Sequence, residues 1–322
     1  MGRRAEALVR LLFVGDVMLD DGPGRALAAG RDPFADFDAE FRAADLRIGN
    51  LECPVATSGT ATPDKVYTFR ASPGVIDRLS GRFDALSVAN NHSGDYGREA
   101  FVETLTLLDM AGIKAVGGGR NLTEAHRAYR VERSGLHIAV LAYNEYKPRA
   151  FEAGPDWPGI AWSEDSQVVR DIRQARADGA DLVIPFMHWG WEREPGPTPR
   201  QRQLARLMID AGADAVVGSH PHVTQGSETY KGKPVIYSLG NFVFDGFASP
   251  ATREGWLLQL TVGRSGVSDW NAVPAYIDAE GIPRRAPPRP AVTLAEPPAA
   301  SVVPPVQQAP VQAPATSPAV SQ

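Results

Sequence analysis

Short apolar runs alternate with helix-patterned stretches over most of this chain, and that alternation restricts it to a mixed α/β fold. Strands are expected at 11–14, 46–48, 85–88, 138–142, 182–186, 215–217 and 235–238. Between them, apolar residues recur at helical spacing in 99–110, 168–175 and 201–213. We therefore predict an α/β domain built on open sheets.

Nearly every predicted strand ends at a side chain that can bind a metal ion or carry a proton. In chain order these side chains are Asp16, Asn50, Glu52, Asn90, Asn91, His92, His188, His220, His222 and Asn241. Ligands of open α/β sheets bind beyond the carboxyl ends of the strands. Turns attract Asp and Asn for local reasons too, but three of the strand ends carry His in a chain with only 6 His. The pattern favours one shared site.

The segment Gly218-Ser219-His220-Pro221-His222 is the strongest single signal. In an extended segment, residues two positions apart point to the same side, so His220 and His222 are expected to present two imidazoles together. Pro221 restricts the backbone between them. The alternative is a pair of unrelated surface histidines. The other strand ends favour the metal-ligand interpretation.

Two further segments carry a histidine after a strand. His92 lies in 89–97, between a strand and a helix, where backbone amides favour anions. The same segment could instead only cap the helix. His188 follows an apolar strand, where a lone His is more often a hydrogen-bonded core residue. Because all three segments share one topological position, we favour His188 as a ligand.

Composition excludes several functional classes. A net charge of -5 argues against a nucleic-acid binder with a broad basic face. Cys53 is the only cysteine, so no intrachain disulfide can form. Its neighbours Glu52 and Pro54 give no reason for a reactive thiolate, which argues against thiol catalysis.

The two ends of the chain differ in composition from the middle. Residues 1–14 combine basic residues with an apolar stretch that is too short for a signal peptide, so we predict a buried first strand. No run reaches the ~18 apolar residues of a membrane span, and we expect a cytoplasmic protein. Residues 283–322 are rich in Pro, Ala, Val and Gln and are expected to form a disordered tail. The folded domain is then 1–282.

Six segments taken together resemble one protein family. They are GDVML (15–19), GNLECPV (49–55), ANNHSGDYG (89–97), MHWGWE (187–192), GSHPH (218–222) and IYSLGNFVF (236–244). In this order they resemble the CapA family of bacterial poly-γ-glutamate (capsule) biosynthesis proteins, a branch of the calcineurin-like metallophosphoesterases. The resemblance covers about residues 9–247 and implies a four-layer αββα sandwich with a metal site at the strand ends. It also implies a metal-dependent hydrolase, with capsule-biosynthesis proteins as partners.

The superfamily motifs imply specific roles for matching residues. The implied metal ligands are Asp16, Asn91, His188, His220 and His222. His92 matches the proton donor. Met18 stands where the first motif has His, and a thioether is a poor ligand for such ions. Asn50 stands where a bridging carboxylate is usual, so either Asn50 or Glu52 fills that position. These departures leave open one metal ion rather than two, or a loss of hydrolysis.

The ligand types suit Mn²⁺, with Fe²⁺ or Zn²⁺ as alternatives, better than Ca²⁺. Water bound to such an ion is a nucleophile near neutral pH. In 65–70, strand alternation places Lys65 and Tyr67 on one face and Arg70 at the end. The resemblance suggests that this segment faces the site and binds an anionic small-molecule or polymer substrate. An exposed amphipathic strand is the alternative.

Three functions remain open at this level. The first is a CapA-like hydrolase in capsule-polymer synthesis, with a metal-activated water as nucleophile. The second is a hydrolase or transferase acting on a γ-glutamyl or other amide bond. The third is a catalytically weak, metal-binding assembly component.

Overall fold

Residues 8–147 and 149–285 are described by the computed structural model and belong to one compact unit. Among them, eight strands form a first sheet in the order β16-β15-β14-β1-β2-β3-β4, with β13 paired to β1. Its strands are β1 (Val9–Val17), β2 (Leu46–Leu51), β3 (Ala85–Ser87), β4 (Lys114–Val116), β13 (Asn241–Val243), β14 (Glu254–Gly263), β15 (Gly266–Ile277) and β16 (Pro283–Arg285). Strands β1 to β4 are mutually parallel, whereas β14, β15 and β16 run antiparallel to their neighbours.

A second sheet of six strands within the same residues has the order β11-β12-β10-β9-β7-β6. Its strands are β6 (Tyr129–Arg133), β7 (Leu136–Asn144), β9 (Leu182–His188), β10 (Val216–Ser219), β11 (Ser227–Tyr230) and β12 (Lys233–Ile236). Strands β7, β9, β10 and β12 are parallel. A separate short pair joins β5 (Gly118–Gly119) and β8 (Gly159–Ile160).

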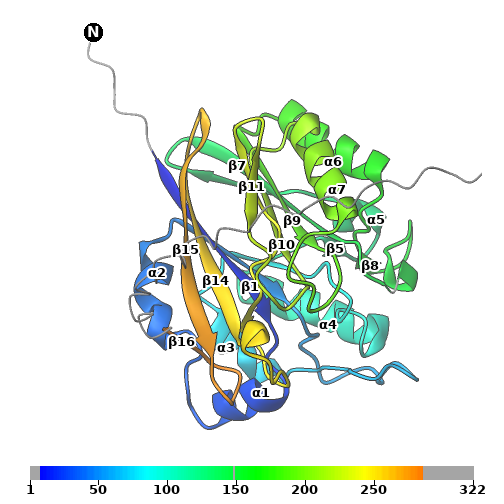
Figure 1. Cartoon of the computed structure of the whole chain (residues 1–322). Coiled ribbons are helices and arrows are strands. Elements are labelled where there is room, and N and C mark those ends of the chain that lie inside the picture. Colours follow the sequence, from blue (N-terminus) through cyan, green and yellow to red (C-terminus); the bar gives the residue numbers. More distant parts are fainter. Residues whose placement is uncertain (1–7, 148, 286–322) are drawn as a thin grey trace, which may run out of the picture. The chain divides into compact units, whose positions relative to one another are not determined.

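The two sheets pack face to face around a central core, and helices cover their outer faces (Figure 1). The helices are α1 (Asp21–Ala28), α2 (Asp38–Ala43), α3 (Ile76–Leu79), α4 (Gly97–Met110), α5 (Leu122–Ala125), α6 (Asp165–Ala177) and α7 (Pro199–Ala211), with short 3-10 turns η1 (Ala35–Phe37), η2 (Pro73–Val75), η3 (Arg149–Phe151) and η4 (Pro250–Arg253). Helices α1 to α4 contribute to the core outside the first sheet, and α5 to α7 to the core outside the second. The molecule is therefore the predicted four-layer αββα sandwich.

Strand alternation explains why the apolar runs are nearly continuous. On β1, Phe13 points into the central core, where its ring lies 5.6 Å from that of Phe186 on β9, while Leu12 points into the outer core. On β9, Ile184 faces the central core and Val183 the outer one. Strands buried on both faces need apolar side chains at every position.

All seven predicted strands and all three predicted helices are present, with bounds shifted by a few residues. Two predictions were wrong. Residues 283–285 form β16 and pair with β15, so they belong to the sheet and not to a tail. Residues 65–70 form no strand. The rest of the predicted tail, 286–322, and residues 1–7 lie outside the described residues. Within the described part, none of the helices is both long and apolar enough to cross a membrane.

The central core makes a first prediction. Ile184→Val is expected to lower the free energy of unfolding by about 0.5–1.5 kcal/mol, because one methyl group is lost from a fully buried position. Val66→Ala is the matched surface control, since Val66 is 84% exposed and should change stability by less than about 0.5 kcal/mol. Urea unfolding compares the two variants, and equal losses would contradict the buried position of Ile184.

Candidate metal centre

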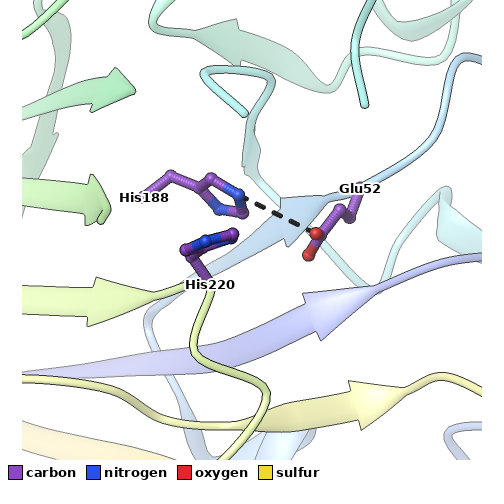
Figure 2. A group of neighbouring side chains, drawn as sticks. All are labelled: Glu52, His188 and His220. Atoms are coloured by element: carbon purple, nitrogen blue, oxygen red, sulfur yellow. Dashed lines mark ion pairs between the residues drawn. The ribbon is translucent and has the colours of Figure 1, made fainter. Parts of the chain in front are cut away.

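The carboxyl ends of both sheets bring five metal-binding side chains together. The first sheet provides Asp16 at the end of β1 and Glu52 just after β2, and the second provides His188 at the end of β9, followed by His220 and His222 after β10. All five are buried. They form two groups, Glu52 with His188 and His220, and Asp16 with Glu52 and His222, and in each group the ligand atoms lie within 4.8 Å of one another. Figure 2 shows the first group, with both imidazoles beside the Glu52 carboxylate.

Glu52 is the side chain common to both groups. Its Oε1 lies 3.8 Å from Nε2 of His188 and 3.8 Å from Nε2 of His222. The neighbouring Asn50 turns its amide nitrogen toward the site and donates to Oδ1 of Asp16 at 2.8 Å. Among the two candidates for a shared ligand, the geometry favours Glu52.

The orientation of Asn50 follows from a chain of hydrogen bonds. The backbone N–H of His92 can only donate, and it donates to Oδ1 of Asn90 at 3.1 Å. The amide nitrogen of Asn90 must then face the other way, where it donates to Oδ1 of Asn50 at 3.0 Å. The Asn50 carbonyl oxygen therefore faces Asn90, and the amide nitrogen faces Asp16. Asn90, which the sequence placed at a strand end without a role, fixes this network.

Asn91 adds an oxygen to the first group. Its Oδ1 lies 2.7 Å from Nε2 of His188, the nitrogen that also faces Glu52. Asn91, Glu52, His188 and His220 therefore form a set of four possible ligands. The sequence-predicted ligands all lie in this centre or, in the case of Asn50, directly beside it.

Three buried polar atoms support a fit to a cation. Within the described residues, Oε1 of Glu52 and both ring nitrogens of His220 have no hydrogen-bond partner. Burying such groups without a partner costs about 1–3 kcal/mol each. Carboxylate oxygens and imidazole nitrogens are the usual ligands of Zn²⁺ and related ions. A divalent cation would satisfy Oε1 of Glu52 and one ring nitrogen of His220 at once, while the other ring nitrogen carries the proton of the neutral imidazole.

The pKa values of the site residues in the absence of a cation also favour the binding of a cation. Burial and the nearby Asp16 carboxylate raise the pKa of Glu52 well above its usual value. Burial would raise the pKa of Asp16 as well, but its hydrogen bond to His222 holds that pKa at about 2. Burial lowers the pKa of His188 to about 3 and that of His220 well below its usual value. Neutral imidazoles are the form that binds metal, and a cation would favour the ionised Glu52.

The backbone of the histidine pair differs from the prediction. His220 and His222 have φ angles of 97° and 57°, so they occupy left-handed or strained conformations rather than an extended segment. Their rings still converge, with centroids 5.9 Å apart. Nδ1 of His222 lies 2.8 Å from Oδ1 of Asn241. Such strain costs about 1–3 kcal/mol per residue and is typical of functional sites.

His92 lies in the loop after β3, beside this centre. Its Nδ1 pairs with Oδ2 of Asp95 at 2.8 Å, and the Phe69 ring packs on it with a centroid distance of 4.6 Å. Burial lowers the pKa of His92 against the opposing effect of Asp95. Asp95 was not predicted as a site residue, although its place three residues after His92 in a turn was the available signal.

The predicted substrate residues are placed differently from one another. Lys65 donates to the Asn91 carbonyl oxygen at 2.7 Å and pairs with Asp95, so it lies close to the site. Arg70 is occupied by the carbonyl oxygens of residues 57–59 and stacks on Tyr96 at 4.2 Å. Tyr67 is 68% exposed. The expected common face of Lys65 and Tyr67 is not present, because the segment is an irregular loop.

Met18 supplies no ligand. Its side chain is buried in the core outside the first sheet, and its sulfur accepts a hydrogen bond from the Asp20 amide at 3.2 Å. Cys53 is buried nearby, and burial raises its pKa to about 12, which agrees with the absence of a reactive thiolate. The ligand that the resemblance implies at position 18 is therefore absent from this centre.

Comparison with known proteins identifies the family of this chain. Residues 10–246 match the family described as "Bacterial capsule synthesis protein PGA_cap". The chain belongs to this family. It is 34% identical over 273 residues to the PGA biosynthesis protein CapA of Bacillus subtilis, with 82% of this chain and 70% of that protein covered. It is 31% identical over 295 residues to the capsule biosynthesis protein CapA of Bacillus anthracis, with 87% and 70% covered.

A solved structure supports the fold assignment. A 5'-nucleotidase precursor from Thermus thermophilus matches with a TM-score of 0.53 at 13% identity, over 87% of this chain and 56% of that one. At this identity the likeness shows the fold alone and not the substrate.

Proposed function

We propose that this PGA_cap family member is a metal-dependent hydrolase that acts in the synthesis of poly-γ-glutamate or a related capsule polymer. The pathway rests on the relatives named for PGA and capsule biosynthesis. The chemistry rests on one observation, the buried Glu52 carboxylate shared by two groups of possible ligands. Mn²⁺ is the proposed ion, with Fe²⁺ or Zn²⁺ as alternatives.

The chain would hold the ions with two overlapping sets. Glu52, Asn91, His188 and His220 hold one, and Asp16, Glu52 and His222 hold the other. A divalent cation supplies a Lewis acid there and lowers the pKa of a water molecule toward 7, which makes a nucleophile at neutral pH.

His92 is the proposed proton donor to the leaving group. Because Nδ1 is paired with Asp95, Nε2 is the ring nitrogen left to face a substrate. The Asp95 carboxylate stabilises the protonated ring and fixes its orientation. Phe69 packs on the ring and limits its rotation. Burial lowers the pKa of His92 against the opposing effect of Asp95, so the protonated ring is a stronger acid but a smaller fraction of the rings is protonated at neutral pH.

An amide bond is the second candidate substrate. Phosphate recognition usually relies on a cationic side chain that is free to bind the anion. Lys65 is paired with Asp95, and Nη1 of Arg70 donates to the carbonyl oxygens of residues 57–59. A γ-glutamyl amide presents a neutral carbonyl at the reacting atom, so it does not need such a cation there.

Removal and return of metal test the proposal. Chelated protein is expected to lose all hydrolysis of phosphomonoesters or of γ-glutamyl anilides, and Mn²⁺ is expected to restore it. Mn²⁺ at about 100 times its Kd should also stabilise the fold by about 2.7 kcal/mol, measured by thermal unfolding. Ca²⁺ is the matched control, since this ligand set suits it poorly. Metal binding without turnover of either substrate class would instead indicate an assembly component.

A further inference from the structure

The two groups of possible ligands are unequal. Glu52, Asn91, His188 and His220 make four, but Asp16, Glu52 and His222 make only three. Four ligands are usual for Zn²⁺ held by protein alone, and Mn²⁺ prefers more. Position 18 contributes none, because the Met18 side chain lies in the outer core.

Glu192 lies beside one histidine of each group. Its carboxylate belongs to a third cluster in which one atom each of Glu192, His220 and His222 lie within 4.8 Å of one another. The Glu192 side chain is exposed, unlike the other ligands. Its carboxylate forms neither a hydrogen bond nor an ion pair with any residue that the structure describes. A carboxylate that faces two buried imidazoles without another partner is available to a cation.

The backbone holds Glu192 in this position. The loop after β9 runs along the loop after β10, with Trp189 N donating to Ser219 O at 3.2 Å and Arg193 N donating to Pro221 O at 2.8 Å. Gly190 makes the turn between these two bonds with a φ of 87°, and a Cβ there would lie 2.8 Å from the Gln201 side chain. The proximity of Glu192 to the histidines is therefore built into two paired loops.

We propose that Glu192 is a ligand of the ion bound by Asp16, Glu52 and His222, and that it supplies the position for which Met18 is unsuited. The proposal rests on the metal centre proposed above. It adds a fourth ligand to the set of three. Because this ligand is exposed, the ion at this position exchanges more readily than the ion held by the buried set of four.

Metal stoichiometry and affinity test the role of Glu192. Wild-type protein is expected to bind two Mn²⁺ ions, one tightly and one more weakly, in calorimetric titration and in elemental analysis after dialysis. Glu192→Gln should lower the affinity for the second ion by at least about tenfold, since even a residue that only hydrogen-bonds to a metal ligand changes metal affinity by about 10–100-fold. Glu194→Gln is the matched control, because Glu194 is an exposed carboxylate two residues along that belongs to none of the three clusters. Glu192→His should restore the second ion.

Three results would overturn the proposal. They are a wild-type chain that binds a single ion, a Glu192→Gln variant that keeps both ions at wild-type affinity, and equal losses in the Glu192→Gln and Glu194→Gln variants. If Glu192→Gln keeps both ions but loses turnover, Glu192 acts on the substrate and is not a ligand. The metal-binding measurements do not depend on hydrolysis, so wild-type protein that binds two ions without turnover would contradict the proposed function and leave this inference standing.

Discussion

Glu52→Gln is expected to weaken the binding of both metal ions by more than about 100-fold, and to abolish metal-dependent hydrolysis with them. The reason is that one oxygen, Oε1, lies 3.8 Å from a histidine of each group. Loss of a residue that only hydrogen-bonds to a metal ligand already lowers metal affinity by about 10–100-fold. Glu52 is itself a proposed ligand, and both sets share it. Gln has nearly the same shape, so the fold should be kept. Elemental analysis and Mn²⁺ titration measure the effect.

Stability of the metal-free protein should change in the opposite direction. Glu52 is fully buried, and Oε1 has no hydrogen-bond partner within the described residues. Replacing this carboxyl group with a neutral amide removes a buried ionisable group, so metal-free Glu52→Gln is expected to be as stable as wild type or more stable. Thermal unfolding with chelator present tests this sign. A large loss of stability would instead mean that the variant lowers metal binding by disturbing the fold.

Asn50→Ala is the control that separates the two candidate shared ligands. Asn50 donates to Asp16 and accepts from Asn90, so its loss should disturb the orientation of Asp16. We expect a drop in metal affinity of about 10–100-fold, which is the range for a partner of a ligand. If Asn50→Ala loses all metal while Glu52→Gln retains it, the assignment of the shared ligand to Glu52 is wrong.

The layers of this fold could be predicted because its central strands are apolar on both faces. In β1 and β9, successive side chains enter the central and the outer core in turn, which gives continuous apolar runs. The long β14–β15 hairpin was not predicted, although buried Leu257, Leu258 and Leu260 give β14 an apolar run that was available as a signal. Strand β15 lacks such a signal. Residues 268–271 of β15 are exposed, so the sequence there lacks an apolar pattern. Its strand conformation comes from ten paired positions with β14, which depend on the folded chain.

The site could be predicted only in part. The strand ends were enough to bring His188, His220 and His222 together, because parallel strands end at one edge of a sheet. The strand ends did not allow a choice between Asn50 and Glu52, because the Asn50 amide is oriented by Asn90, which lies 40 residues away along the chain. The same holds for Lys65, whose partner Asp95 lies 30 residues along the chain. Such contacts have no local signal.

His92→Asn is expected to lower the rate of hydrolysis by about 10²–10⁴-fold and to leave the metal content unchanged, because the proton donor is lost while the proposed ligands remain. The Asn amide can take the place of Nδ1 and keep the hydrogen bond to Asp95. His126→Asn is the matched control. His126 is a partly buried histidine, and its Nδ1 lies 2.8 Å from an Asp171 carboxylate oxygen, outside the metal centre. It should change stability without changing the rate of the folded enzyme.

Leaving-group dependence then separates proton donation from mere packing beside the metal centre. A nitrophenolate leaves without a proton, whereas an alkoxide or an amine must be protonated as it departs. If Nε2 of His92 supplies that proton, His92→Asn should slow substrates with alkyl or amine leaving groups far more than nitrophenyl substrates. If His92 only shapes the site through its contacts with Phe69 and Asp95, both kinds of substrate should slow by the same factor. A uniform loss would therefore remove the proton-donor role and keep His92 as a positioning residue.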